Sequence, residues 1–335
     1  MRLIEKVWFH HHRAKYVLVP LLLPLTLLFW LLSSARRIAY RWKILPSVKV
    51  EKPVIVVGNI GVGGNGKTPV VLWLVALCRE MGLTPGVISR GYGGLAPHYP
   101  YLINPASTVI ETGDEALMIY RRSQVNISIG SDRVKCAHQL IAKGCDILIT
   151  DDGLQHYRLQ RDIEFIVIDG KRRFGNQLLL PAGPLREGLW RLNTVDYIIN
   201  NGEKPLVNEM PMTLIPGPLI NCRTGESCLA ETLRAEFSHV NAIAGIGSPE
   251  RFFATTRTLG FILNQQQGFV DHHHFQASDF DEFSDDIPLL MTEKDAIKCY
   301  GFAKANWWYV PVDARIPKIE ENLLVKRIEA LTNQT

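Results

Sequence analysis

A glycine-rich turn constrains this chain more than any other feature of its sequence. Residues 61–68 read GVGGNGKT and match the pattern G-x-x-x-x-G-K-T at every position. Glycines let such a turn curl until backbone N–H groups point at nucleotide phosphates, while the lysine reaches the β- and γ-phosphates and the threonine hydroxyl reaches Mg²⁺. The sequence therefore predicts a site for ATP and Mg²⁺ formed by Gly61, Val62, Gly63, Gly64, Asn65, Gly66, Lys67 and Thr68.

The flanks of this turn have the patterns that it requires. The β-branched run PVIVVGN (53–59) predicts a buried strand before it, and residues 67–82 predict a helix after it. Strand and helix patterns then alternate as far as residue 170. This alternation predicts an α/β fold of the P-loop NTPase type, with a mostly parallel sheet and helices on both faces.

A second apolar run supplies acidic residues at its end. CDILITDDG (145–153) predicts a buried strand followed by Asp151 and Asp152. An Asp pair after a strand often only caps a turn, but downstream of a P-loop such carboxylates reach Mg²⁺ directly or through water. We predict a metal role for one of these acids, with Asp151 as the ligand and Asp152 as a catalytic residue.

A stretch rich in proline and glycine divides the chain. Residues 211–221 read PMTLIPGPLIN, which predicts a linker, and residues 240–260 again have a strand, glycine-turn and helix pattern. We therefore expect four segments, with the bounds 1–43 (N-terminal), 44–210 (P-loop domain), 211–222 (linker) and 223–335 (smaller α/β domain).

The N-terminal segment combines an apolar run with cations. Residues 16–35 carry no charge over 20 positions, which is long enough to span a membrane. A secretory signal would have a shorter apolar core, and a buried core helix would rarely have cations on both flanks. A spanning helix and an interfacial one both stay open, and Pro20, Pro24 and the basic flanks favour the interfacial form. In either form we expect the protein at the cytoplasmic face of the membrane, where ATP is.

Charge and cysteine content exclude other classes of protein. Residues 1–43 hold eight Lys or Arg against one acid, a net charge of +7, so the remainder carries −3 in a chain of +4. A nucleic-acid-binding domain would spread its cations over the folded body, so we expect no nucleic acid as a partner. The six cysteines are scattered without a C-x-x-C pair, which indicates a reducing compartment. No obligate protein partner is indicated.

Three further segments carry candidate groups. The segment TGDEALM contains Asp114 and Glu115 at a predicted helix start, where capping is the simpler explanation. VDHHHF contains three consecutive histidines (272–274), which cannot all face one site and lack the spacing of a zinc site. SRGYGG has Arg90 and Tyr92 just after a predicted strand end, where open α/β sheets bind ligands.

Eight ordered blocks of this sequence resemble one family. They are GNIGVGGNGKTP (58–69), SRGYGG (89–94), GDEA (113–116), GSDR (130–133), DDGLQH (151–156), RRFGN…LLPAGPLRE (172–187), VDHHHF (270–275) and TEKDA (292–296). In type and order they resemble the tetraacyldisaccharide 4′-kinase family, the inner-membrane lipid A kinases of Gram-negative bacteria. The resemblance covers nearly the whole chain, including its apolar N-terminus.

The resemblance implies transfer of the ATP γ-phosphate to the 4′-hydroxyl of a lipid A precursor, a tetraacylated disaccharide 1-phosphate, in a cleft between two α/β/α domains. It implies that Asp114 is the general base, that His272 pairs with it and that Glu115 lies on the metal side. It further implies lipid contacts for Arg90, Tyr92, Gln155 and His156, and phosphate contacts for Arg133 and Arg186. Ala116 and Leu154 stand where the family often has Pro and Phe, and neither touches a reacting group. We favour a neutral His272 that orients Asp114, because an imidazolium would lower the pKa of that carboxyl group.

A nucleotide-switch protein is the alternative, either a partitioning ATPase or a GTPase. The deviant ATPases carry an extra lysine where this chain has Gly63, and guanine specificity usually needs N/T-K-x-D, whereas TEKD has its lysine one position late. Turnover separates the two classes, because a switch hydrolyses nucleotide without lipid and a kinase is nearly idle without its acceptor.

Overall fold

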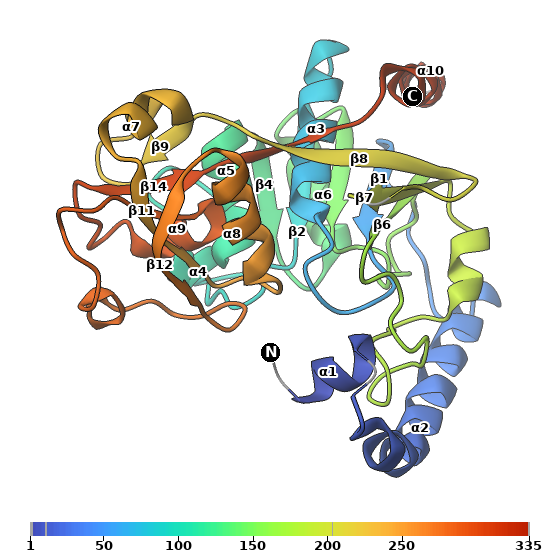
Figure 1. Cartoon of the computed structure of the whole chain (residues 1–335). Coiled ribbons are helices and arrows are strands. Elements are labelled where there is room, and N and C mark those ends of the chain that lie inside the picture. The colour runs from blue at the N-terminus through green and yellow to red at the C-terminus, as the bar shows by residue number, and fades with distance from the viewer. Residues whose placement is uncertain (1–2, 11, 203, 334–335) are drawn as a thin grey trace.

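The computed structural model describes residues 3–10, 12–202 and 204–333, which form two β-sheets and a helical N-terminal segment (Figure 1). Within these residues the larger sheet has nine strands, in the order β15 (Val312–Arg315), β8 (Glu209–Pro216), β7 (Tyr197–Asn201), β6 (Ile163–Asp169), β1 (Val54–Gly58), β5 (Ile147–Asp151), β2 (Pro85–Ser89), β4 (Asn126–Ile129) and β3 (Tyr101–Leu102). Strands β8 to β4 run parallel, and only the edge strands β15 and β3 are antiparallel to their neighbours. The mostly parallel α/β fold predicted from the sequence is confirmed.

Helices cover both faces of the larger sheet because its central strands are apolar on both faces. In β1, Ile55 and Val57 face one core and Val54 and Val56 face the other, with all four side chains buried. The first core is closed by α3 (Lys67–Glu80), α5 (Asp114–Ser123) and α10 (Lys318–Thr332), and the second by α6 (Arg133–Ala142). Two short elements, α4 (Val109–Thr112) and the 3₁₀ helix η1 (Leu189–Asn193), lie in the connections.

The smaller sheet has its own two-sided core. Its strands run in the order β10 (Ser227–Cys228), β9 (Leu219–Asn221), β14 (Trp307–Val310), β13 (Leu289–Thr292), β11 (His239–Ala244) and β12 (Ile262–Gly268). Helices α7 (Ala230–Glu236) and α8 (Pro249–Thr258) pack on one face, and α9 (Glu293–Cys299) with the 3₁₀ helix η2 (Ala277–Phe280) on the other. The loop after β12 and the start of α9 face the larger sheet (Figure 1).

The end of the chain does not follow the predicted domain bounds. Residues 211–222, predicted as a linker, form most of β8 and all of β9. Strand β15 returns to the larger sheet and pairs antiparallel with β8, and α10 buries Leu324 and Ile328 in the larger core. Residues 312–333 therefore pack with the P-loop side, although the sequence analysis grouped them with the smaller domain. The reason is a long-range strand pairing that no local pattern encodes.

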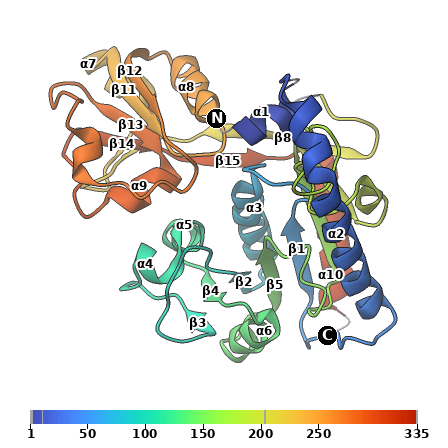
Figure 2. The same ribbon diagram turned by 90° about the horizontal axis from the view of Figure 1, so that it is seen from below.

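The N-terminal segment consists of α1 (Leu3–Phe9) and α2 (Lys15–Arg41), which lie along one side of the larger sheet (Figure 2). Helix α2 continues through Pro20 and Pro24 and exposes most of its leucines. Among the described residues it is the helix long and apolar enough to cross a membrane by length and composition, so it is a candidate membrane anchor. Arg2, one of the cations counted above, lies outside the described residues.

The buried residue of α2 is Thr26, whose hydroxyl accepts a hydrogen bond from the N–H of Ala182 at 3.0 Å. The Trp8 indole of α1 donates to the carbonyl of Pro181 at 3.1 Å. Both contacts fasten the N-terminal helices to residues 172–187, which we call the strap.

Candidate active site

The P-loop curls between β1 and α3 at the carboxyl edge of the larger sheet. Gly63 and Gly66 have φ angles of 107° and 90°, in the left-handed region that favours glycine. A Cβ at Gly66 would lie 2.5 Å from the side-chain nitrogen of Asn201, which donates to the carbonyl of Asn65 at 3.0 Å. Lys67 opens α3, so the unpaired N–H groups of the helix start follow the loop directly and favour a bound phosphate.

Six of the eight predicted P-loop residues, 63–68, line the main cavity of about 820 Å³. Gly61 and Val62 do not. The N–H of Val62 donates to the carbonyl of Pro184 at 2.9 Å, and Gly61 forms a β-bridge with Leu185. The phosphate contacts of these two residues stay a prediction, and in this structure their backbone fastens the P-loop to the strap.

Asp151 lies at the end of β5, beside Val57 of β1. Its side chain is 2 % exposed, and its Oδ1 has no hydrogen-bond partner among the described residues. Burial, with the nearby charge of Glu115, raises the pKa of Asp151 to about 7. A buried carboxylate with an unpaired oxygen next to a second carboxylate is a favourable environment for a cation.

Asp152 faces the cations of the site. Its carboxylate accepts a hydrogen bond from Arg186 at 2.9 Å and lies 3.6 Å from Nζ of Lys67. Burial would raise the pKa of Asp152, but the charges of Lys67 and Arg186 outweigh it and lower the pKa. The carboxylate therefore stays ionised and links the P-loop lysine to the strap.

Two predicted contacts lie outside the cavity. Arg133 is 4 % exposed and donates to the backbone carbonyls of Asp151 (2.7 Å) and Asp152 (3.1 Å), so it supports the acidic strand end from behind and does not face a phosphate. The ring of His156 is also absent from the cavity lining. Burial, with the charges of Arg133 and Arg161, lowers the pKa of His156 to about 4, which keeps the ring neutral.

Asp114 and His272 meet although they come from different sheets. Nδ1 of His272, in the loop after β12, lies 3.1 Å from Oδ2 of Asp114, the first residue of α5. Burial would raise the pKa of Asp114, but the hydrogen bond with His272 and the charge of Lys294 lower it to about 2. The same hydrogen bond raises the pKa of His272. Asp114 is 6 % exposed and is absent from the cavity lining, whereas His272 lines the cavity.

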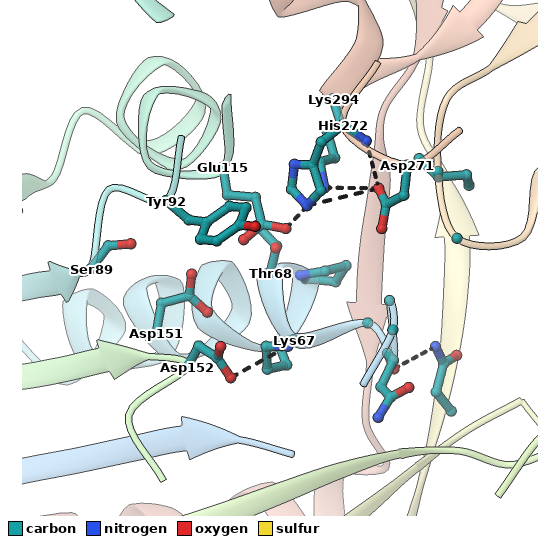
Figure 3. A pocket seen from close by; sticks show the side chains of 18 of the residues that line it. Lys67, Thr68, Ser89, Tyr92, Glu115, Asp151, Asp152, Asp271, His272 and Lys294 are labelled. Carbon is teal, nitrogen blue, oxygen red and sulfur yellow. Dashed lines mark hydrogen bonds and ion pairs between the residues drawn. The ribbon is translucent and has the colours of Figure 1, made fainter. Parts of the chain in front are cut away.

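Sequence reasoning missed Lys294, which the TEKDA block contains at the start of α9. Its Nζ lies 3.0 Å from Glu115 and 3.4 Å from Asp271. Figure 3 shows Lys294, His272 and Asp271 gathered on one side of the cavity, opposite Asp151 and Asp152, with Lys67 and Thr68 between them. The signal that could have found it is a lysine placed in the first turn of a helix, where a cation is unusual.

The predicted acceptor-side residues Arg90, Tyr92 and Gln155 all line the cavity. The ring of Tyr92 is exposed and lies 5.4 Å from that of His272. The amide of Gln155 donates to Glu187 at 3.0 Å and to the carbonyl of Asn59 at 3.1 Å. Tyr92 therefore lies on the His272 side of the cavity, and Gln155 lies beside the end of β1 and the strap.

The cavity continues to the candidate membrane anchor. Phe29, Ser33, Arg36 and Arg37 of α2 line it, together with Leu180 of the strap. The sequence predicts the two arginines only as membrane-flanking cations, whereas in the structure they also face the site. A ligand in this cavity can extend from the P-loop to an exposed apolar helix.

Nucleotide phosphates at the P-loop would face His272, which is hydrogen-bonded to Asp114, across the cavity, and such a pair can serve as the general base for phosphoryl transfer. The fold and the site thus define a P-loop kinase. The model of one family, described as Tetraacyldisaccharide-1-P 4′-kinase, matches residues 18–330. The chain belongs to this family of lipid A biosynthesis kinases, transferases that phosphorylate a hydroxyl group.

Individual relatives agree over almost the whole chain. A Tetraacyldisaccharide 4′-kinase of Colwellia psychrerythraea is 59 % identical over 336 residues, covering 98 % of both chains. One from Vibrio cholerae is 47 % identical over 327 residues, covering 97 % of this chain and 96 % of its own. A crystal structure described as the "apo" form of LpxK from Aquifex aeolicus in complex with ATP matches with a TM-score of 0.77 at 25 % identity, covering 93 % of this chain and 100 % of that one.

Proposed function

We propose that this protein transfers the γ-phosphoryl group of ATP to the 4′-hydroxyl of a tetraacylated disaccharide 1-phosphate, at the cytoplasmic face of the inner membrane. The observation that carries the proposal is a single cavity bordered by the P-loop, by His272 and by α2. The names of the relatives support the acceptor, and the ATP in the Aquifex aeolicus structure supports the donor.

The membrane location follows from the acceptor and from α2. Each buried CH₂ group contributes about 0.8 kcal/mol, so a lipid with four acyl chains stays in the bilayer and the enzyme must reach it there. Helix α2 has 27 residues, which corresponds to about 40 Å, and its apolar side chains are largely exposed. Arg36 and Arg37, near its end, are suited to the level of anionic headgroups. Spanning and interfacial forms are both compatible with this length.

We assign the proton acceptor to His272 rather than to Asp114. Asp114 is buried, and a carboxyl group with a pKa of about 2 is a weak base. His272 lines the cavity, and its raised pKa makes it the better acceptor. In this assignment Asp114 accepts the hydrogen bond from Nδ1–H, and Nε2 of the neutral ring takes the proton of the 4′-hydroxyl as its oxygen attacks phosphorus. This reverses the roles that the family resemblance implied.

The phosphate end of the cavity carries the charges needed for transfer. Lys67 and Arg186 are held near the phosphates by Asp152, and they would stabilise the negative charge that develops during transfer. Asp151, with its unpaired Oδ1, and the hydroxyl of Thr68 are the groups that fit Mg²⁺, which takes one or two protein ligands besides phosphate. When bound, Mg²⁺ supplies charge neutralisation on the phosphates. Glu115 is the second carboxylate of this region and is engaged by Lys294.

The test is incubation of the full-length protein in detergent micelles with γ-labelled ATP and the disaccharide 1-phosphate lipid. We expect label in a bis-phosphorylated lipid, with one ADP formed per product, and almost no ADP without the lipid. ADP formation that does not depend on the lipid would instead support the nucleotide-switch alternative and refute the proposal.

A further inference from the structure

Lys294 joins the two sheets at the active site. It is the second residue of α9, on the smaller sheet, and its side chain is only 14 % exposed. Its ammonium group lies 3.0 Å from Glu115 and 3.9 Å from Asp114, both on α5 of the larger sheet, and 3.4 Å from Asp271. The same group lies 3.4 Å from Nε2 of His272.

The chemistry of these two neighbours restricts the proton on the imidazole ring. An ammonium group has three donors and no acceptor, so the ring nitrogen that faces it must offer a lone pair. Nε2 is then unprotonated, and the ring hydrogen is on Nδ1, where it is donated to Asp114 at 3.1 Å. A doubly protonated ring would place an N–H group against the ammonium group, which is unfavourable.

We infer that Lys294 is a positioning residue that holds His272 in the tautomer with an unprotonated Nε2, and that the ring takes the proton of the acceptor hydroxyl once this hydroxyl replaces the ammonium group at the Nε2 lone pair. The inference rests on the proposed role of His272. This role would explain the lysine of the TEKDA block, which nucleotide binding and helix capping leave unexplained.

The carboxylates around the ring oppose the effect of Lys294 on the pKa of His272. Asp114 on α5 and Asp271 on the same loop as His272 both raise the pKa of the ring, while burial and Lys294 lower it. Glu115 is bonded to Lys294, the ring of Tyr92 lies beside the imidazole, and Lys298, one turn further along α9, is paired with Asp295 at 2.9 Å. Among the described residues, Lys294 is therefore the cation beside Nε2, where it opposes the charge of Asp271, whose carboxylate lies 3.9 Å from the same nitrogen.

The experiment is NMR titration of the full-length protein in micelles, with ¹⁵N in the histidine rings. The His272 signal is assigned by its loss in His272→Gln. We expect Lys294→Met to raise the pKa of His272 by about one unit or more, because a neighbouring charge shifts a pKa by about 1–3 units, and to increase the fraction protonated at Nε2. Lys294→Arg keeps the charge and should stay near the wild-type value. Lys304→Met, which removes an exposed lysine of the smaller sheet, should change nothing.

Kinetics of the same variants provide a second readout. In Lys294→Met the acidic limb of the pH profile of kcat/KM should move to higher pH by as much as the pKa of His272 rises. KM for ATP should stay within about twofold of wild type. Lys294→Gln serves as the neutral variant if the methionine variant does not give a cooperative thermal transition. An unchanged His272 pKa and tautomer in a folded neutral variant would overturn the inference. So would a large rise in KM for ATP with an unmoved limb, because Lys294 would then bind phosphate.

Different results would refute the proposed function and the role of Lys294. A wild-type protein that phosphorylates no lipid would refute the proposed function. The ring titration needs no lipid, so it tests Lys294 alone.

Discussion

The donor side and the acceptor side of this site are built in different ways. The phosphate-binding turn of the donor side is one segment, since the lining residues 63–68 run from the loop after β1 into the start of α3. The acceptor side joins Asp114 and His272, which are 158 residues apart and belong to different sheets. Phosphate binding thus depends on local backbone geometry, whereas proton transfer depends on how two cores pack together. Changes to each side should therefore affect different kinetic steps.

The largest effect is expected on the donor side, from Lys67→Met. This change removes the cation at the phosphate end and leaves Asp152 with Arg186 alone. We expect kcat to fall on the order of 10³-fold, as when a preorganised charge is removed from a transition state. Steady-state assays with saturating lipid measure it, with the exposed Lys143→Met as the control. Turnover within tenfold of wild type would contradict the donor-side assignment.

Asp114→Asn should affect the acceptor side alone. Loss of the carboxylate removes the partner of His272, and we expect kcat to fall about 10²-fold with KM for ATP unchanged. Asp114 raises the pKa of His272, so its removal lowers that pKa and moves the acidic limb of the profile to lower pH. This direction is opposite to the one expected for Lys294→Met. A shift of the acidic limb to higher pH would show that His272 is not the titrating base.

Gly66→Ala tests the local geometry of the donor turn. The left-handed φ of 90° costs an L-residue about 1–2 kcal/mol, and the new Cβ also meets the side chain of Asn201. We expect roughly tenfold weaker ATP binding by calorimetry and a lower thermal midpoint. Gly82→Ala is the matched control, because Gly82 has a φ of 76° but no atom within 4 Å of the Cβ position. Equal losses of ATP affinity in both variants would refute the proposed role of the Asn201 contact.

The smallest effect is expected from Thr26→Val, which touches neither side directly. The N–H of Ala182 loses its acceptor, at a cost of about 1 kcal/mol in the free energy of unfolding. Because the strap also holds the P-loop, kcat should fall by about two- to fivefold, while binding to vesicles stays constant in this apolar helix. Thr26→Ser keeps the hydroxyl and should behave as wild type. Weaker vesicle binding with unchanged stability would contradict this role.

The sequence predicted the features that one segment encodes. The strand expected at 53–59 and the helix expected at 67–82 are β1 and α3, with ends that differ by one or two residues. The acids after β5 were found because apolar β-branched runs and strand-end carboxylates are local patterns. The family blocks also brought Asp114 and His272 together before the fold was known.

What the sequence could not predict depends on contacts between distant segments. Arg133 and His156 lie within recognisable blocks, but only the fold turns Arg133 toward the carbonyl groups at the end of β5 and buries His156. Strand β15 and helix α10 return to the larger sheet because β15 pairs with β8, and the whole smaller sheet lies between these two strands in the sequence. The proposed exchange of roles between Asp114 and His272 rests on the hydrogen bond between them and on the nearby charge of Lys294, and composition reveals neither.

The pairing of Asp114 with His272 across two sheets has a consequence for water, the simplest competitor for a phosphoryl group. The chain passes between the sheets through the β8–β9 and β14–β15 connections, and the proton acceptor is complete only while the two sheets are in contact. With His272 as the proposed base, a molecule whose sheets separate would keep its P-loop but would have no base facing the γ-phosphate. Such separation would protect ATP from hydrolysis before a lipid binds, and slower ATP hydrolysis without lipid than with it would be the sign of it.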